Sequence, residues 1–483
     1  MQTPWPFQKV MARSAIGSSR PAPRRRRSGS SHVAPVRAQT NTMTIIETFA
    51  AYAANPGAGV DAPEVIHHAK RAVVDWYAAL IPGAVEAPAT LLERALADDL
   101  DRGRARLALG RSASARTAAL INGTAAHTVE VDDIYKHAIY HPGAPTIAAA
   151  LAAGQQRQVS GMDFLRAVIV GYEVSTRIGA AMGRTHYRYW HNTGTVGTFG
   201  AAAAAAAILK LDASRSAHAL ATCATCAAGL QQAFRMDSMS KPLHAGRAAE
   251  GGLLAALAAD AGVTGSLDVI DGDAGLGRAM SDGPDWAAAA ATLGREYHIT
   301  QMTFKNHACC GHTFAAIDGA LALQREHRFS VDEIESVRVA TYGPALEVAG
   351  NRNPRTAAEA RFSLPYAMAS ALIHGSVRLA AFTPQRLADP AIRALMSGIE
   401  LQVDPRLDAA FPGQRAARVT VRTRDGRELE YLQPNRKGDP EEPLSDAELN
   451  DKFLELAAPV LGASAATDLL QRLWQLDSAI SLP

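Results

Sequence analysis

The sequence of 483 residues predicts a mainly α-helical protein, in which a large helical domain is interrupted by a smaller α+β domain. Three observations predict this class. Alanine is abundant and aromatic residues make up only 6% of the chain, a composition that favours closely packed helices. Apolar residues recur at helical spacing from Ile45 onward. Strand-like segments are confined to residues 297–432.

The first 42 residues differ in composition from the rest of the chain. They hold eight lysines and arginines, they are rich in Ser and Pro, and no acidic residue precedes Glu47. Such a segment cannot bury a core, so it is either a disordered basic tail or an over-extended start ahead of Met43. We favour the over-extended start, because periodic structure begins just after Met43. The total charge is +2, so these eight cations leave residues 47–483 with a charge of −6, which argues against nucleic-acid binding.

The helical domain is expected to span residues 43–299. Its predicted helices lie at 62–81, 89–100, 114–127, 144–154, 161–180, 197–210, 213–230 and 246–262. The seven alanines from Ala201 to Ala207 do not predict a membrane span, because Lys210 and Asp212 end the run short of about 18–20 apolar residues. We therefore expect a buried central helix, no membrane partner and a cytoplasmic location.

The α+β domain is expected at 300–442, as an insertion before C-terminal helices at 443–483 that return to the helical domain. The sequence predicts strands at 297–305, 334–342, 398–403 and 416–432, with helices at 312–325 and 356–374. Asp425-Gly426 is a strong hairpin signal. Ser445 and Glu448 predict a capping box at the start of the first returning helix.

Three carboxylates and three imidazoles lie in one stretch with apolar flanks, residues 122–141: Glu130, Asp132, Asp133, His127, His137 and His141. Polar side chains in such surroundings must be paired or must serve a ligand. Pro142 disfavours helical geometry in the residue before it, so we expect His141 where a helix gives way to a loop, open to a cleft. The same proline argues against a helical metal site made by His137 and His141, despite their spacing.

Two further motifs could bind an anion at a helix start. Residues 190–197 place His191 beside Thr193 and Thr195, either of which could cap a helix whose free N–H groups favour an anion. Residues 240–246 place Lys241 before a Gly-Ala helix start, where it could clamp a carboxylate. A plain cap and a solvated surface lysine are the alternatives.

Two motifs belong to the predicted α+β domain. Residues 304–312 place Lys305 at a strand-to-helix turn, where it could bind an anion. Zinc is disfavoured there, because Cys309 and Cys310 are adjacent and no second ligand pair lies nearby. In residues 361–366, Tyr366 could donate a hydrogen bond to a substrate oxygen, or it could be a core tyrosine.

The remaining patterns offer no support for a metal or a cofactor. Cys223 and Cys226 lie in an alanine-rich helix without a βαβ pattern, so a redox role is not expected. The four cysteines do not suit an iron–sulfur cluster. No G-x-G-x-x-G follows a strand and no P-loop occurs, so a nucleotide cofactor is not predicted.

Taken in order, these motifs resemble the MmgE/PrpD family over about residues 43–475. The motifs are NGTAAH, EVDD, HPG, GYEVSTRIG, HNTGTVGTFGAAAAAA, SKPLHAG, FKNHACCGH and RFSLPY. The family includes 2-methylcitrate dehydratases and cis-aconitate decarboxylases. The resemblance implies a helical domain with a smaller lid domain, a homodimer, no cofactor, and a small polycarboxylate substrate held between domain and lid.

The resemblance also implies the roles of the candidate residues. His141 and His191 would stand in the active site, with the acidic run from Glu130 to Asp133 lining it. The expected catalytic residues are His141, His191, Asp132, Asp133 and Tyr366, the last approaching from the lid. The expected substrate-binding residues are Lys241, Lys305, Glu130, Thr193 and His312.

The expected reaction is dehydration of a 2-methylcitrate-like acid. His141 or His191 would remove the proton α to a carboxylate, and the other would protonate the departing hydroxyl. Asp132 or Asp133 would orient an imidazole, and the two lysines would stabilise the enolate-like charge. A cis-aconitate-type decarboxylase, an epimerase or isomerase, and a non-catalytic carboxylate-binding dimer are the alternatives. Glu130, Cys310 and the interval from Asp133 to His141 depart from the decarboxylase pattern, which favours the dehydratase.

Overall fold

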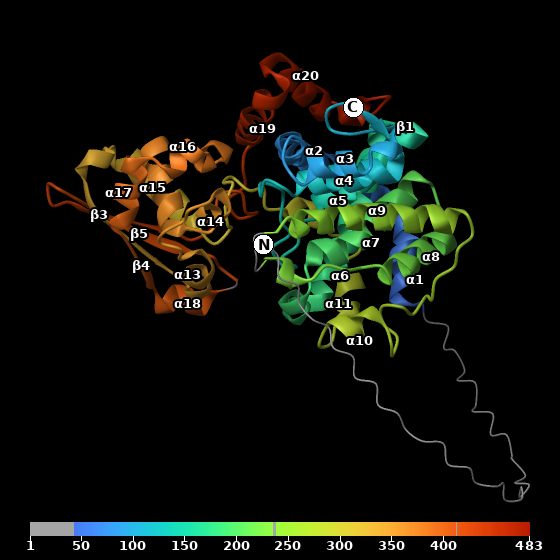
Figure 1. Cartoon of the computed structure of the whole chain (residues 1–483). Coiled ribbons are helices and arrows are strands. Elements are labelled where there is room, and N and C mark those ends of the chain that lie inside the picture. Colours follow the sequence, from blue (N-terminus) through green and yellow to red (C-terminus); the bar gives the residue numbers. More distant parts are fainter. Residues whose placement is uncertain (1–42, 235–237, 412) are drawn as a thin grey trace, which may run out of the picture. The chain divides into compact units, whose positions relative to one another are not determined.

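The computed structural model describes residues 43–234, 238–411 and 413–483 (Figure 1). The predictions made for residues 1–42 lie outside the described residues. Helices dominate the described chain and the sheets are small, so the mainly α class is confirmed. None of the helices within these described ranges is long and apolar enough to cross a lipid bilayer.

The first part of the described chain is helical. Its helices are α1 Ile45–Ala54, α2 Pro63–Gly83, α3 Ala89–Ala95, α4 Ala115–Ala126, α5 Gly143–Arg157, α6 Gly161–Tyr189, α7 Asn192–Ile208, α8 Ala213–Ala224, α9 Ser240–Asp260, α10 Leu276–Met280 and α11 Trp286–Ala291. A short antiparallel pair, β1 Leu100–Arg106 and β2 Ser112–Ala113, precedes α4.

Helix α7 lies at the centre of this part, packed against α5, α6, α8 and α9. Its alanines from Ala201 to Ala206 are buried, so the run is a core helix as predicted. Small residues are needed on the facing helix as well. A Cβ atom on Gly252 of α9 would lie 2.6 Å from the backbone oxygen of Thr198, so only glycine permits this approach.

The second part combines one sheet with short helices. The sheet has the order β4-β3-β5-β6, built from β3 Ile334–Thr341, β4 Ile399–Val403, β5 Ala417–Thr423 and β6 Glu428–Gln433. Only the β3–β4 pairing is parallel, and the predicted hairpin at Asp425-Gly426 is confirmed. The helices are α12 Phe314–His327, α13 Gly343–Ala349, α14 Ala357–Arg361, α15 Leu364–His374, α16 Pro384–Leu387, α17 Pro390–Ser397 and α18 Pro405–Ala410.

Two predicted elements in this region are wrong. The strand predicted at 297–305 is a 3-10 helix at His298–Gln301 followed by a single bridge from Thr303 to Ile134, because the N–H of Ile299 donates to the carboxylate of Glu173 instead of to a strand. The helix predicted at 356–374 is divided into α14 and α15, because Ser363 caps α15 by accepting the N–H of Tyr366.

Several helix ends also differ from the prediction. The segment predicted as helix at 89–100 stops at Ala95, and the one at 213–230 stops at Ala224. Helix α7 begins at Asn192 with His191 as its N-cap, so neither Thr193 nor Thr195 caps it. The predicted helix at 246–262 begins earlier, at Ser240, which places Lys241 inside its first turn.

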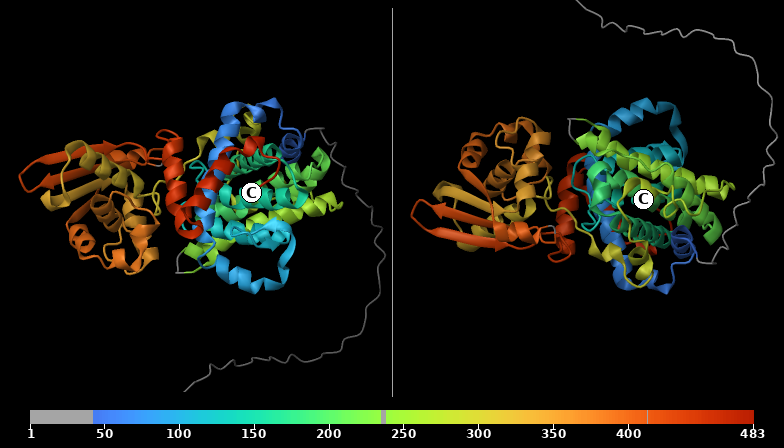
Figure 2. Two further views of the ribbon diagram at one scale, coloured as in Figure 1. Left: turned by 90° about the horizontal axis from the view of Figure 1, so that it is seen from above. Right: turned by 90° about the horizontal axis from the view of Figure 1, so that it is seen from below.

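The C-terminal helices α19 Asp446–Leu461 and α20 Ala463–Trp474 pack against α2, which Figure 2 shows as red helices beside a blue one. The predicted capping box at Ser445 is confirmed. The Lys452 ammonium of α19 lies 2.5 Å from the Asp75 carboxylate of α2 and donates to the backbone oxygen of Val131 at 2.7 Å. This buried contact joins both helices to the acidic stretch that the sequence singled out.

Candidate active site

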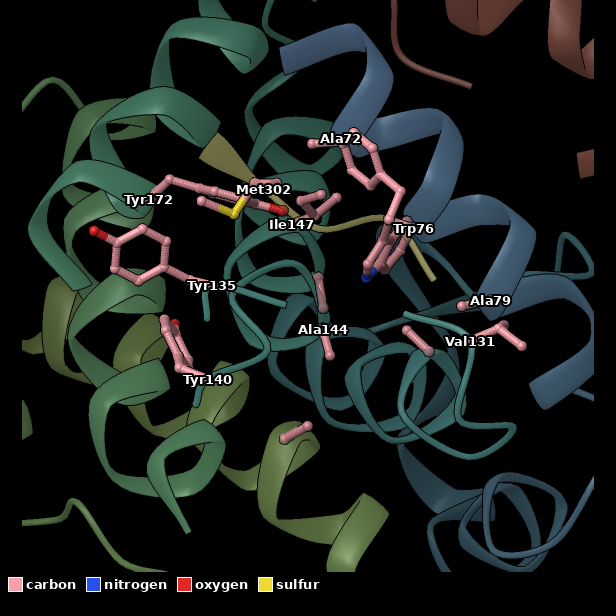
Figure 3. Packing of buried hydrophobic residues seen from close by; sticks show 14 of the residues in the cluster. Ala72, Trp76, Ala79, Val131, Tyr135, Tyr140, Ala144, Ile147, Tyr172 and Met302 are labelled. Carbon is pink, nitrogen blue, oxygen red and sulfur yellow. The ribbon is translucent and has the colours of Figure 1, made fainter. Parts of the chain in front are cut away.

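The acidic stretch forms a loop, residues 127–142, which we call the acid loop. It connects α4 to α5, so His141 lies just before a helix and not after one, contrary to the prediction. Helix α4 already ends at Ala126, fifteen residues before His141. Buried groups hold the loop in place: the Asn192 amide donates to the Ala138 carbonyl, and the His141 N–H donates to the Thr193 hydroxyl at 3.3 Å. Figure 3 shows Val131, Tyr135 and Tyr140 of this loop within the packed core.

Four imidazoles from three segments form a histidine cluster: His127 and His141 of the acid loop, His191 at the start of α7, and His244 of α9. The ring centroid of His127 lies 4.8 Å from that of His141 and 5.4 Å from that of His191. The Nδ1 atoms of His191 and His244 are 3.1 Å apart. One of these two nitrogens must therefore donate a proton to the other.

Asp132 lies at the base of the histidine cluster and is almost fully buried. Its Oδ2 is 2.7 Å from Nδ1 of His127 and 3.2 Å from Nδ1 of His141, and its Oδ1 is 3.7 Å from the Lys305 ammonium. Burial alone would raise the pKa of Asp132, but the two histidines and Lys305 outweigh it and hold that pKa well below its usual value. The carboxylate is thus ionised and can fix the tautomer of an imidazole.

Two ammonium groups meet at Glu130 of the acid loop. Lys241 pairs with its carboxylate, and Lys305 donates to its backbone oxygen at 3.0 Å and approaches its carboxylate at 3.5 Å. Burial would raise the pKa of Glu130, but Lys241 and Lys305 together lower it. Lys305 is almost completely buried, whereas Lys241 keeps a fifth of its side chain exposed. Both cations predicted to bind carboxylates therefore already hold one.

Three imidazoles of the histidine cluster, those of His141, His191 and His244, have pKa values below the usual one and are neutral at pH 7. Burial lowers the pKa of His141 to about 4, although Asp132 opposes this shift. Burial, with the charges of His127 and Lys241, lowers the pKa of His191 well below its usual value. A neutral imidazole has a free lone pair, so these groups are ready to accept a proton.

Three buried polar atoms at this place have no hydrogen-bond partner among the described residues: Nε2 of His127, Oδ1 of Asp132 and Nδ1 of His141. Buried polar atoms are normally satisfied, and unpaired ones are expensive. Two of these atoms still face a charged or polar group, since Nδ1 of His141 lies 3.2 Å from Oδ2 of Asp132 and Oδ1 of Asp132 lies 3.7 Å from the Lys305 ammonium. Nε2 of His127 is therefore the atom of the three that is left open to a further partner.

Sequence comparison places the chain in a known family. The sequence model for the MmgE/PrpD N-terminal domain matches residues 47–289, and that for the MmgE/PrpD C-terminal domain matches residues 307–476. The chain belongs to the MmgE/PrpD family. Every residue of the histidine cluster falls within the first match, and Lys305 lies just before the second.

Curated relatives of this MmgE/PrpD protein are named for one activity. The chain is 29% identical to the cis-aconitate decarboxylase-like protein oryM of Aspergillus oryzae, over 82% of this chain and 87% of that protein. It is 28% identical to the cis-aconitate decarboxylase of Homo sapiens, over 73% and 75%. It is 24% identical to the cis-aconitate decarboxylase of Aspergillus terreus, over 74% and 78%.

Among the residues that the structure describes, one group of atoms could hold a metal ion: the ring nitrogens of His127 and His141 and a carboxylate oxygen of Asp132 lie within 4.8 Å of one another. Two imidazoles and a carboxylate are common zinc ligands. However, both Nδ1 atoms face the same oxygen, and the His127–Asp132 hydrogen bond already occupies two of the three donors. Lys305 also adds a positive charge beside them, so the geometry fits a hydrogen-bonded proton-transfer group better than a metal centre.

The structure brings most of the predicted site residues together and leaves three outside. His141, His191, Asp132, Glu130, Lys241, Lys305 and Thr193 surround the same place. Asp133 lies behind the acid loop, where it accepts the Tyr172 hydroxyl at 2.8 Å and the Gly143 N–H at 3.0 Å. Burial and the charge of Asp75 raise the pKa of Asp133 to about 8, so it is a protonated structural group.

Tyr366 and His312 are the other two residues that the structure does not place in the cluster. The Tyr366 hydroxyl donates to the backbone oxygen of Ala381 at 2.5 Å and is buried in α15, which matches the core tyrosine alternative. His312 is hydrogen-bonded to the Tyr342 hydroxyl at 2.8 Å. Burial and the nearby cations Arg415 and Arg436 lower the pKa of His312 to about 3, so it is a neutral neighbour of a different, arginine-lined region.

Three groups near the site were not predicted to act in it: His127, His244 and Arg361. His127 was noticed only as part of the acidic stretch, and its contact with Asp132 depends on a chain reversal that spacing does not reveal. His244 follows Lys241 by three residues on α9, and this i, i+3 spacing could have predicted a shared face. Arg361 is the last residue of α14, and its Nε has no hydrogen-bond partner among the described residues. Burial lowers the pKa of Arg361, although the charge of Glu130 acts to raise it.

Proposed function

We propose that this protein is a cofactor-independent lyase that acts on a small polycarboxylate, with dehydration of a 2-methylcitrate-like hydroxy acid as the first candidate reaction. The observation that supports it is the meeting of Lys241 and Lys305 with Asp132-bonded imidazoles at one buried place. Cations bind the carboxylates of such a substrate, and neutral imidazoles move its protons.

The two lysines supply the substrate affinity in this proposal. Lys241 and Lys305 now share Glu130, so an incoming carboxylate joins or replaces that contact. Arg361 provides a third cation close enough for its charge to act on Glu130. An anionic substrate in this buried place gains strongly from these charges, because water does not screen them.

His141 is the base in this proposal. With Nδ1 facing Asp132, its Nε2 carries the lone pair that removes the proton α to the bound carboxylate. The electron pair moves into the carboxylate as an enolate, whose charge the lysines stabilise. The β-hydroxyl then leaves with the proton that the His141 imidazolium gives back, the carbon–carbon double bond forms, and water is released.

Decarboxylation is the second candidate, and the names of the curated relatives favour it. In that reaction the bond to one carboxylate breaks first, carbon dioxide leaves, and an imidazolium protonates the carbanion. Decarboxylation needs a protonated imidazole at the start, whereas dehydration begins with a neutral imidazole that takes up a proton. The lowered pKa values of His141 and His191 favour the neutral form. We therefore place dehydration first.

We also propose that the region 300–442 moves as a lid over the site and that the protein is a homodimer. Lys305 and Arg361 come from the region 300–442, so opening of that region would release both cations from the site and closure would return them. Closure that excludes water would also strengthen each charge interaction with the substrate.

The proposal is tested by incubating the purified chain with EDTA and a panel of hydroxy-, unsaturated and imino-polycarboxylates, followed by mass analysis. Loss of 18 mass units, about one water per substrate, supports dehydration, and loss of 44, about one carbon dioxide, supports the second candidate. Turnover should disappear in His141→Gln and persist in His327→Gln, an exposed histidine far from the site in sequence. Binding of an acid without any product would overturn the lyase assignment.

A further inference from the structure

A cavity lies beside the acid loop and is lined by none of the residues of the histidine cluster. Its volume is about 370 Å³, within the range of ligand pockets. One wall is the acid loop at residues 136–139, and another is α6 at Gly183, Arg184 and Tyr187. The third wall comes from residues that follow α18 and β6, including Arg415 and Arg436. Segments far apart in the sequence thus enclose one space.

Four cations and two carboxylates line this cavity. Arg436 is held by Asp439 through bonds of 2.8 and 2.6 Å, and Lys136 pairs with Glu441. Arg184 and Arg415 form no ion pair with a carboxylate among the described residues. The residues that line the cavity therefore carry two more positive than negative charges. His137, which also lines the cavity, has its pKa lowered by burial and Lys136, so it adds no charge at pH 7.

The guanidinium groups of Arg184 and Arg415 both lie near one aromatic ring, that of Phe411. The Cζ atom of Arg184 lies 5.8 Å from the Phe411 ring centroid, and that of Arg415 lies 6.0 Å from it. Phe411 is in turn stacked on Tyr342, with centroids 4.5 Å apart and planes 12° apart. At these distances each cation is within reach of a cation–π contact with the same ring.

We propose that this cavity is an anion-binding site for a small polyanion, a di- or tricarboxylate or a phosphate. Two guanidinium groups that lack a counter-ion form the usual recognition element for carboxylate and phosphate oxygens. Tyr187 lines the same cavity. Neither of the lysines that hold Glu130 lines it.

Two sources could supply such an anion: the substrate on its way to the histidine cluster, or another anion that binds only here. The acid loop is shared by both places, since residues 136–139 line the cavity and Glu130 and His141 belong to the cluster. The charge chemistry is the same for both sources, so kinetics must distinguish them.

The test is calorimetric titration of the full chain with citrate and with inorganic phosphate at low ionic strength. The background variant is Lys241→Gln/Lys305→Gln, which removes the cations of the histidine cluster. Binding should persist in this background and weaken at least about tenfold when Arg184→Gln and Arg415→Gln are added. The matched control adds Arg94→Gln and Arg102→Gln, two exposed arginines, and should bind as the background does.

Circular dichroism of each variant checks that the chain is folded. In the otherwise unchanged chain, a raised KM with unchanged kcat after Arg184→Gln/Arg415→Gln identifies the substrate as occupant. Lost citrate or phosphate binding with an unchanged KM identifies a separate anion. The site is overturned if binding is already absent in the lysine background, or if the arginine changes leave it unaltered. Neither result depends on which reaction the histidine cluster performs.

Discussion

Asp132 is the residue through which the histidine cluster is organised, so Asp132→Asn is the sharpest single perturbation. The substitution preserves shape and removes one charge. At 3.7 Å and an effective dielectric constant of about 20, the attraction between Asp132 and Lys305 is about 4–5 kcal/mol, before desolvation is subtracted. The amide can also present an N–H to His127, which would turn the ring or change its tautomer.

We expect kcat to fall by about 10³–10⁴-fold, the scale of losing a carboxylate that orients a catalytic imidazole. The free energy of unfolding should change by only about 1–3 kcal/mol, because the amide oxygen can still accept a hydrogen bond. The assay is turnover of whichever acid the wild type converts, with thermal unfolding by circular dichroism alongside. Asp98→Asn, an exposed aspartate, is the control. A loss of less than tenfold in a folded variant would refute the reasoning.

Three further predictions concern pH and stability. As pH is lowered, kcat/KM should begin to fall near pH 4, because His141 has a pKa of about 4 and must be neutral to act. A fall with an apparent pKa of 6.5 in the folded enzyme would contradict this prediction. The pKa of Asp133 is raised from 3.8 to about 8, so its contribution to the free energy of unfolding is lost as pH rises from about 4 to 8. Urea unfolding at pH 5 and pH 8 should therefore show a smaller fall in the free energy of unfolding for Asp133→Asn than for the wild type. An equal fall in the two proteins would count against this account. Lys452→Met should lower the free energy of unfolding by about 3–5 kcal/mol, because it leaves the buried Asp75 carboxylate without its partner. The double change Asp75→Leu/Lys452→Met should recover most of that loss. A mild effect of the single change would show that the two residues do not form a buried ion pair.

Much of the fold could be predicted because its signals are local. Helical spacing predicted α2 and α5, and the Asp425-Gly426 turn predicted the hairpin. One failure came where a distant side chain competed with local preference, and the other came at a helix cap inside a predicted helix. Glu173 binds the N–H of Ile299 and prevents a strand at 297–305, and Ser363 caps α15 inside a segment that reads as one helix.

The candidate site was predictable in composition more than in geometry. Apolar surroundings singled out the acid loop, and the motifs around them pointed to His141, His191, Lys241 and Lys305. Which carboxylate faces the imidazoles was not predictable, because Asp132 and Asp133 are adjacent and point to opposite sides of the loop: Asp132 towards His127, Asp133 towards Tyr172. Tyr366 could not be separated from a core tyrosine without knowing that Ala381 lies beside its hydroxyl.

The central claim is that His141 transfers a proton at the carbon next to a lysine-bound carboxylate, and isotope exchange tests it most directly. The chain is incubated in deuterium oxide with an acid that it converts, and deuterium in recovered substrate and product is followed by mass spectrometry over time. The account predicts incorporation of deuterium at that carbon by the wild type and by His327→Gln, and none by folded His141→Gln. Equal incorporation by His141→Gln would contradict it.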